Sequence, residues 1–101
     1  MKHILRKYEV SGFTLLESLY PPGLRQPCHT HALASFSFVL AGSYVEGFGS
    51  RKIPRQPSTI IFHPPRESHS VDYGGEAVRI LSVQVDFNRL DHIREHSVVL
   101  D

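Results

Sequence analysis

The chain has almost no cysteine, and its charges nearly balance. Cys28 is the only cysteine, so an internal disulfide framework is excluded. Eleven Lys and Arg residues stand against ten Asp and Glu residues, a net charge of +1 that predicts no strongly basic surface for nucleic acid. No apolar run approaches the ~20 residues of a membrane-spanning helix, and no signal peptide is visible. We expect a cytoplasmic protein that neither spans a membrane nor binds nucleic acid directly.

The turn and strand patterns predict one all-β domain. With 101 residues, a single domain over 1–101 is the expected organisation. Gly and Pro occur often, and short runs rich in β-branched and aromatic residues lie between them. Strands are predicted over 13–20, 34–40, 43–48, 58–63 and 78–87. The third should form a hairpin with 51–53 through the turn at Gly49-Ser50. Short strands at this spacing are typical of a sandwich or a barrel.

Only the end of the chain has a helical pattern. Leu90 and Ile93 recur at helical spacing, and Asp86 or Asn88 can cap the start. These residues predict a short C-terminal helix over 86–97.

Two histidines one residue apart precede an alternating run, in PCHTHALASFSF at residues 27–38. On a continuous strand His29 and His31 point to the same side, and Ser35 and Ser37 follow on that side. Phe36 and the other apolar residues of the run then take the opposite face. A polar stripe inside a barrel predicts the wall of a ligand pocket or two nitrogen ligands for one metal, whereas a solvent-facing stripe needs no ligand.

A second segment supplies further histidines, in STIIFHPPRESHSVDY at residues 58–73. An apolar strand ends at His63 before Pro64, and His69 follows five residues after the proline. Together the two segments resemble the two motifs of the cupin family. The matching positions are Gly23, His29, His31, Gly42, Pro64 and His69. The likeness covers residues 23–73, about half of the chain, and implies a cupin-type antiparallel β-barrel, or jelly roll, with the short helix after it.

The chain departs from the family pattern at four positions. The carboxylate ligand of the first motif falls at Ser35, or at Phe36 with the longer spacing. Ser58 and Arg66 replace the glycines of the second motif, and Tyr73 replaces its asparagine. The resemblance therefore implies a metal site without its carboxylate.

The remaining ligands implied by the resemblance are His29, His31 and His69, with His63 close by. Three histidines can bind a divalent transition metal such as zinc, iron(II), nickel or copper and leave open positions. Loss of the carboxylate argues against a metal, because it removes a negative charge from the site.

A closer resemblance is to the N-terminal effector-binding domain of AraC-type transcription regulators. The likeness rests on HTHALASFSFVLAGSYVEGFGSRKI, on STIIFHPPRESHS and on VRILSVQVDFNRLDHIREHS. It implies a cupin-like barrel that binds a small-molecule effector and often mediates dimerisation. The sequence has no helix-turn-helix pattern, so the likeness is to the sensing domain, with a stand-alone small cupin as the alternative.

Two functions stay open from the sequence. In the first, a pocket of His29, His31, Ser35, Ser37, His63 and His69 senses a small molecule, and no residue is catalytic. In the second, the chain is a small metal-dependent cupin enzyme of the oxygenase, lyase or isomerase type. We favour sensing because no separate general acid or base stands out among these residues.

A homodimer is also expected. Phe36 and Phe38, or Leu90 and Ile93 of the predicted helix, are apolar residues that can form its seam. The alternative is that the helix folds back over Phe36 and Phe38 within one chain.

Overall fold

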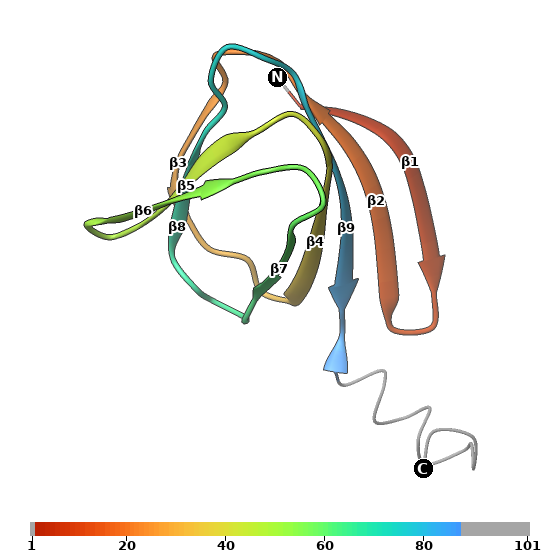
Figure 1. Cartoon of the computed structure of the whole chain (residues 1–101). Helices are drawn as coiled ribbons and strands as arrows, with labels where there is room; N and C mark the ends of the chain where they lie inside the picture. Colours follow the sequence, from red (N-terminus) through yellow and green to blue (C-terminus); the bar gives the residue numbers. More distant parts are fainter. Residues whose placement is uncertain (1, 88–101) are drawn as a thin grey trace.

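The computed structural model describes residues 2–87, and these residues form nine β-strands (Figure 1). The strands are β1 His3–Val10, β2 Phe13–Tyr20, β3 Arg25–His29, β4 Ala34–Ala41, β5 Tyr44–Phe48, β6 Arg51–Arg55, β7 Ile60–His63, β8 His69–Asp72 and β9 Val78–Val85. None of the described residues belongs to a helix long and apolar enough to cross a membrane.

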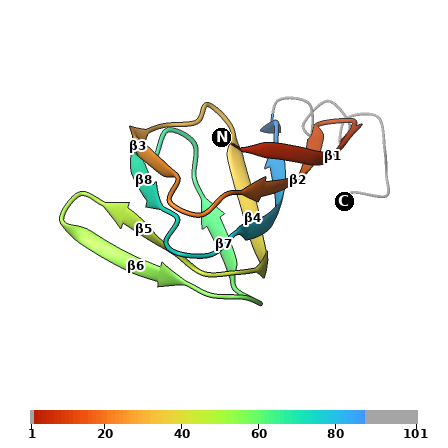
Figure 2. The same ribbon diagram turned by 90° about the horizontal axis from the view of Figure 1, so that it is seen from above.

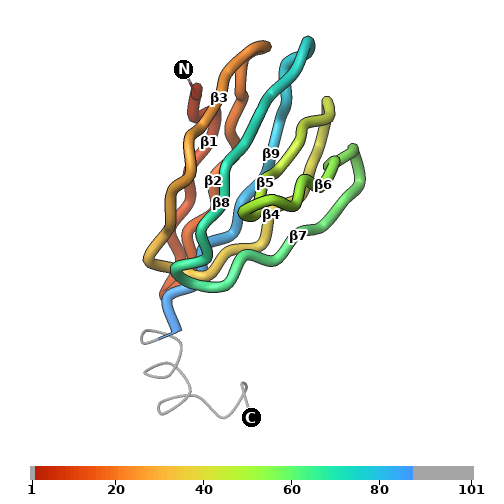
Figure 3. Tube along the Cα trace, turned by 90° about the vertical axis from the view of Figure 1, so that its left-hand side faces the viewer, coloured from red at the N-terminus to blue at the C-terminus, as the bar shows by residue number. Residues whose placement is uncertain are grey.

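The strands form two antiparallel sheets that face each other (Figure 2). One sheet has five strands in the order β1-β2-β9-β4-β7, and the other has four in the order β3-β8-β5-β6. The long strands of the first sheet stand behind the shorter strands of the second when the molecule is turned (Figure 3). The prediction of an all-β, antiparallel architecture is confirmed.

The strands with strong apolar alternation were predictable. The run at 13–20 is β2, and the hairpin through Gly49-Ser50 joins β5 to β6. The structure adds three strands that the sequence pattern did not show. Strand β1 is exposed along its length, β3 contains Pro27, and β8 has only four residues, so none of them has a strand pattern that is easily recognised.

The predicted helix lies almost entirely outside the described residues. Of the range 86–97, only Asp86 and Phe87 are described, so the helix stays a prediction.

The apolar core fills one end of the space between the sheets. Its buried members are Tyr20, Val39, Tyr44, Ile61, Val71, Tyr73, Val78 and Ile80. The rings of Tyr20 and Tyr73 stack with their centroids 4.5 Å apart, and Tyr44 packs 5.3 Å from Tyr73. Burial raises the pKa of all three phenols, so they stay neutral at physiological pH.

The other end of the same interior is polar. Along β4, β7 and β9 the inward residues change from Val39 and Ile80 to Ser37 paired with Ser82, and then to Ser35 flanked by His63 and Gln84. Because side chains on a strand alternate between faces, this change occurs within a few residues of each strand. The candidate site lies at this polar end.

Candidate metal centre

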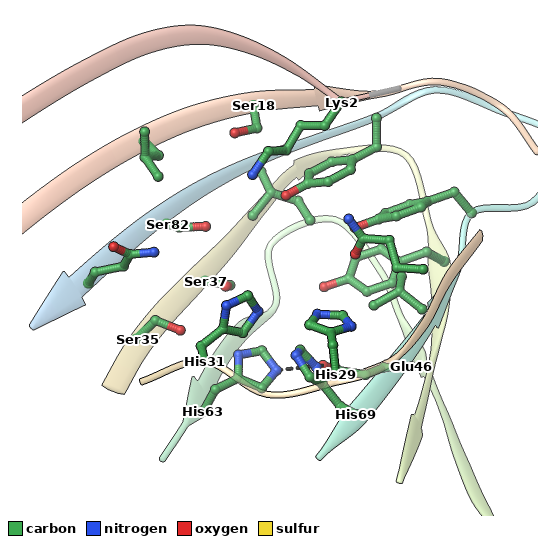
Figure 4. Close-up of a pocket in the computed structure, with 18 of the residues that line it drawn as sticks. Lys2, Ser18, His29, His31, Ser35, Ser37, Glu46, His63, His69 and Ser82 are labelled. Carbon is green, nitrogen blue, oxygen red and sulfur yellow. Dashed lines mark hydrogen bonds and ion pairs between the residues drawn. The ribbon is translucent and has the colours of Figure 1, made fainter. Parts of the chain in front are cut away.

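Three histidines from three different segments meet at the polar end of the interior (Figure 4). His29 is the last residue of β3 and lies directly opposite His69, the first residue of β8. His31 lies in the turn that follows β3. The ring centroids are 4.5 Å apart for His29 and His69, 4.8 Å for His29 and His31, and 5.4 Å for His31 and His69. One nitrogen of each ring lies within 4.8 Å of the others, so the three form a candidate ligand set.

The continuous strand expected through His29, His31, Ser35 and Ser37 is wrong. Strand β3 ends at His29, and the chain crosses to the other sheet before β4 begins at Ala34. The crossing is held in place by the backbone N–H of Arg66, which donates to the carbonyl oxygen of His31 at 2.8 Å. The histidines and serines still line one cavity, but they reach it from opposite sheets.

A buried carboxylate that the sequence analysis missed lies beside the histidines. Glu46 of β5 has only 1 % of its surface exposed. Its Oε1 accepts from Nε of Arg55 at 2.9 Å, and Nη2 of the same guanidinium forms an ion pair with it at 2.9 Å. Its Oε2 accepts from His63 Nε2 at 2.5 Å and from His69 Nδ1 at 2.6 Å. Both carboxylate oxygens therefore have partners, which compensates for the loss of water.

These contacts keep Glu46 ionised. Burial alone would raise its pKa, but the hydrogen bonds from His63 and His69 and the nearby Arg55 outweigh it and lower the pKa to about 2. An ionised carboxylate only accepts hydrogen bonds, so His63 and His69 must both act as donors to it.

This requirement places a proton on Nδ1 of His69. Its Nδ1 carries the proton given to Glu46, so in the neutral ring Nε2 has a free lone pair. Among the side-chain nitrogen and oxygen atoms buried in the described part of the chain, this Nε2 is the one without a hydrogen-bond partner. A carboxylate that holds one ring nitrogen while the other is left for a metal is the usual support of a metal-binding histidine.

His29 has a comparable support from the backbone. Its Nδ1 lies 2.7 Å from the carbonyl oxygen of Pro27. Because a carbonyl only accepts, Nδ1 is the donor and the lone pair of the neutral ring is on Nε2. The neutral form of His31 is favoured, since burial and the neighbouring His29 and His69 lower its pKa. Neutral imidazoles are the form that binds metal.

A second group, Glu46, His63 and His69, also brings ligand atoms together. Its separations of 2.5 and 2.6 Å are hydrogen-bond lengths. Ligand atoms at ~2.0–2.1 Å from one tetrahedral metal lie about 3.3 Å apart. We therefore assign the metal position to His29, His31 and His69, and His63 to the hydrogen bonding of Glu46. His63, one of the predicted pocket residues, lines the cavity but is turned toward Glu46.

The cavity beside the histidines is small and rich in hydroxyl groups. Its volume is about 110 Å³, below the ~300–1,000 Å³ of most pockets for drug-sized ligands. Ser35, Ser37 and Ser82 line its wall. Lys2 lies across the cavity from the histidines (Figure 4), with Nζ 5.8 Å from the ring centre of Tyr20. Such a site fits a metal ion and a ligand of a few non-hydrogen atoms.

The two replaced glycines of the second motif keep a glycine-like backbone. Ser58 has φ 70° and Arg66 has φ 65°, in the left-handed region that side chains other than glycine rarely adopt. Both flank β7, and Arg66 is the residue whose N–H holds His31. The local shape of the motif is thus retained although its glycines are not.

The sequence did contain a signal for Glu46. In the strand Tyr44–Phe48, alternation puts Tyr44, Glu46 and Phe48 on one face, and both neighbours are aromatic. A charge between two aromatic residues on the inward side indicates a buried acid with partners. The family spacing places the carboxylate at Ser35 or Phe36 and therefore does not point to Glu46.

The comparisons with known proteins support the fold. No protein-family model and no curated protein matches the chain. Solved structures do, among them a cupin superfamily protein from Desulfitobacterium hafniense DCB-2, with 14 % identity and a TM-score of 0.73 over 84 % of this chain and 77 % of that one. The chain therefore has the cupin fold, as the sequence resemblance implied; nothing specific to AraC-type domains emerges.

Two enzymes are also among the similar structures. The DMSP lyase DddQ from Ruegeria pomeroyi DSS-3 is 21 % identical, with a TM-score of 0.71 over 84 % of this chain and 46 % of that one. The polyketide cyclase RemF from Streptomyces resistomycificus is 28 % identical, with a TM-score of 0.69 over 75 % of this chain and 56 % of that one. The match thus spans only about half the length of each enzyme.

Proposed function

We propose that the chain is a metal-binding cupin domain that senses a small polar molecule, as the effector-binding part of an AraC-type transcription regulator. The observation that carries the metal part is the buried, unpartnered Nε2 of His69, whose ring is oriented by Glu46 and lies beside His29 and His31. A buried polar atom without a partner is costly, and a metal ion would satisfy it.

The donor set fits a divalent transition metal held by His29, His31 and His69. When bound, such a metal supplies a Lewis acid with positions left for a small ligand. The protein itself contributes the orientation of the rings, through Glu46 and the Pro27 carbonyl. It also contributes a wall of serine hydroxyls that can donate to the ligand and, in Lys2, a cation facing the cavity. The small volume and this lining favour a compact polar or anionic ligand.

Binding fits the cavity better than catalysis does. Glu46 is the only carboxylate among the described residues that line it, and its low pKa makes it a weak base. The phenols of Tyr20, Tyr44 and Tyr73 have raised pKa values, which makes them reluctant acids. Effective proton transfer needs a group whose pKa lies near the working pH, and neither the carboxylate nor the phenols meet that condition. The histidines that line the cavity are taken up by the proposed metal and by the hydrogen bonding of Glu46.

The regulator role rests on the three segments that resemble AraC-type domains and on the near-neutral charge of the chain. In this proposal the chain reports the ligand and does not itself touch DNA, which a helix-turn-helix region would bind.

The second candidate is a metal-dependent cupin enzyme. It is favoured by the positions that three histidine ligands leave open and by the fold shared with a lyase and a cyclase. Metal-stimulated turnover that disappears in a His69→Ala variant would establish this candidate in place of sensing.

Cobalt can test the open metal position. Protein made without an affinity tag is freed of metal, loaded with Co²⁺ and titrated with acetate as a small anionic probe. We expect a visible absorption band that changes with acetate, because acetate can enter a position that the three histidines leave free. His31→Ala should lose the band and His3→Ala, an exposed control on β1, should keep it. A cobalt spectrum that acetate leaves unchanged would contradict the proposed ligand position.

A further inference from the structure

One wall of the cavity is lined by polar side chains without a partner in the protein, and we call these four side chains the polar wall. They are Ser35 and Ser37 of β4 with Gln84 and Ser82 opposite them on β9. Within residues 2–87, none of the four side chains has a hydrogen-bond partner. Ser37 is only 8 % exposed, and its hydroxyl opens onto the cavity. A hydroxyl in such a place needs water or a ligand, so the wall is arranged to contact a polar molecule.

The charges around the cavity leave it positive once a metal is bound. Apart from histidines, the charged residues that line it are Lys2 and Glu46. The charge of Glu46 is already compensated by the guanidinium of Arg55, whose Nε and Nη2 both lie 2.9 Å from Oε1. A divalent metal on three neutral histidines adds two positive charges, and Lys2 adds one more. A ligand that carries negative charge at more than one point is therefore favoured.

Lys2 lies on the opposite side of the cavity from the histidines (Figure 4). It directly precedes β1, and its Nζ lies 5.8 Å from the ring centre of Tyr20. Its charge is felt at the histidines, because burial, the other histidines and Lys2 together lower the pKa of His31. Among the described carboxylates, none forms an ion pair with Lys2. The ammonium group is thus available to an anionic ligand, at the far side of the cavity from the candidate metal centre.

We propose that the ligand is a short dicarboxylate, with one carboxylate at the candidate metal centre and the other on Lys2. The polar wall then lies beside the chain that joins the two carboxylates, where its hydroxyl and amide groups can hydrogen-bond to polar substituents. We assign carboxylates and not phosphates, because a planar carboxylate takes less room in a cavity of about 110 Å³. The same volume requires a short joining chain.

This proposal rests on the metal-binding function proposed above and makes Lys2 a residue that determines specificity. The metal centre accepts any small carboxylate, whereas Lys2 selects molecules with a second one. Matched pairs of carboxylates test this role. The full chain loaded with Co²⁺ is titrated with malonate and propionate, and with succinate and butyrate; each pair has the same number of carbon atoms and differs in one carboxylate. The cobalt absorption band gives the four dissociation constants.

We expect at least one dicarboxylate to bind roughly tenfold more tightly than its monocarboxylate partner, the effect of one hydrogen bond to a charged group. Because a dicarboxylate can also chelate the metal with both groups, the variant Lys2→Met decides. It should remove the preference for the dicarboxylate and leave the affinity for the monocarboxylate almost unchanged. Lys7→Met is the matched control, since Lys7 lies on β1 with its Nζ 3.3 Å from Glu9, and it should leave both affinities unchanged. Far-ultraviolet circular dichroism confirms that each variant is folded.

The outcomes separate this proposal from the one on which it rests. A native chain without a cobalt band, or with a band that no carboxylate changes, would contradict the metal centre and the dicarboxylate site together. A band that responds to all four probes, with equal affinities within each pair, would overturn the dicarboxylate site alone. So would a preference for the dicarboxylate that Lys2→Met leaves intact, or one that Lys7→Met removes equally.

Discussion

At the polar end of the interior, the two faces of the five-stranded sheet differ in the opposite sense from most sheets that line a protein interior. On β4, Ser35 and Ser37 point inward, whereas Phe36 and Phe38 between and after them point outward. Across the sheet, the inward row runs from His63 to Gln84, and the outward row next to it runs from Phe62 to Val83. A shift of one residue in strand register would exchange the faces.

This difference teaches that the interior is built around polar groups that satisfy one another. A polar interior is stable only if its groups satisfy one another or bind something. Glu46, which faces the same interior from β5 of the four-stranded sheet, is the centre of that arrangement with its three hydrogen bonds and its ion pair to Arg55. The interior between the two inward faces is therefore interpreted as a binding site, whereas the outward face of the five-stranded sheet carries exposed apolar side chains.

The largest expected effect comes from breaking the polar interior at Glu46, which faces the five-stranded sheet from β5 of the other sheet. Glu46→Ala leaves Arg55 and the donor nitrogens of His63 and His69 buried without an acceptor. We expect a loss of about 3–5 kcal/mol in the free energy of unfolding, measured by urea denaturation. Glu17→Ala, which removes a partly exposed carboxylate of the outward face, should cost less than about 1 kcal/mol. Equal losses would refute the difference between the faces.

Acid should weaken the inward face specifically. The folded-state pKa of Glu46, about 2, lies below its ordinary value of 4.5, so its ionised form stabilises the fold fully above pH 4.5 and loses that effect as the pH falls toward 2. The integrated contribution is ~3 kcal/mol. Relative to Glu46→Gln, the native chain should therefore lose that much more stability between pH 5 and pH 2. Parallel pH profiles of the two proteins would exclude the assigned contacts.

Metal removal should also act on the inward face alone. At a free metal concentration a hundred times the dissociation constant, binding adds ~2.7 kcal/mol. For a domain of this size that is a rise in melting temperature of roughly 10–20 °C. Thermal unfolding with Zn²⁺ and with a chelator should show this difference in the native chain and in Ile60→Lys. If the same difference in melting temperature remains in His29→Ala, the assignment of His29 as a metal ligand is contradicted.

The smallest effect concerns the turn that holds His31. Arg66 has a positive φ, which costs a non-glycine residue about 1 kcal/mol. Arg66→Gly should therefore stabilise the chain by up to about 1 kcal/mol and leave metal binding intact, because the backbone N–H to His31 is kept. Urea denaturation measures the gain, and a clear destabilisation would mean that the arginine side chain has an unrecognised contact.

Much of the fold followed from local pattern. Alternation identified β2, the β5–β6 hairpin and the outward set on β4, because side-chain period is a local property. Strand β1 did not show because it is exposed along its length, although it pairs with the neighbouring β2. The short strands β3 and β8 did not show because their pairing partners lie far away in the sequence.

The candidate site was predictable in part for the same reason. The resemblance to the cupin motifs implied that His29, His31 and His69 gather, but not that the chain turns between His31 and Ser35. The role of Glu46 could not be predicted, because it depends on contacts with Arg55 and His63 from other strands. A charge on the inward side of a strand is visible in a sequence, whereas its partners are set by tertiary packing.

The metal content of the purified chain tests the central claim most directly. The protein is expressed without a histidine tag, and bound metal per chain is determined by elemental analysis for the native form, for His31→Ala with His69→Ala, and for His3→Ala. We predict close to one divalent transition metal per chain in the native form and in His3→Ala, and almost none in the double variant. Equal metal content in all three proteins would contradict the site formed by His29, His31 and His69.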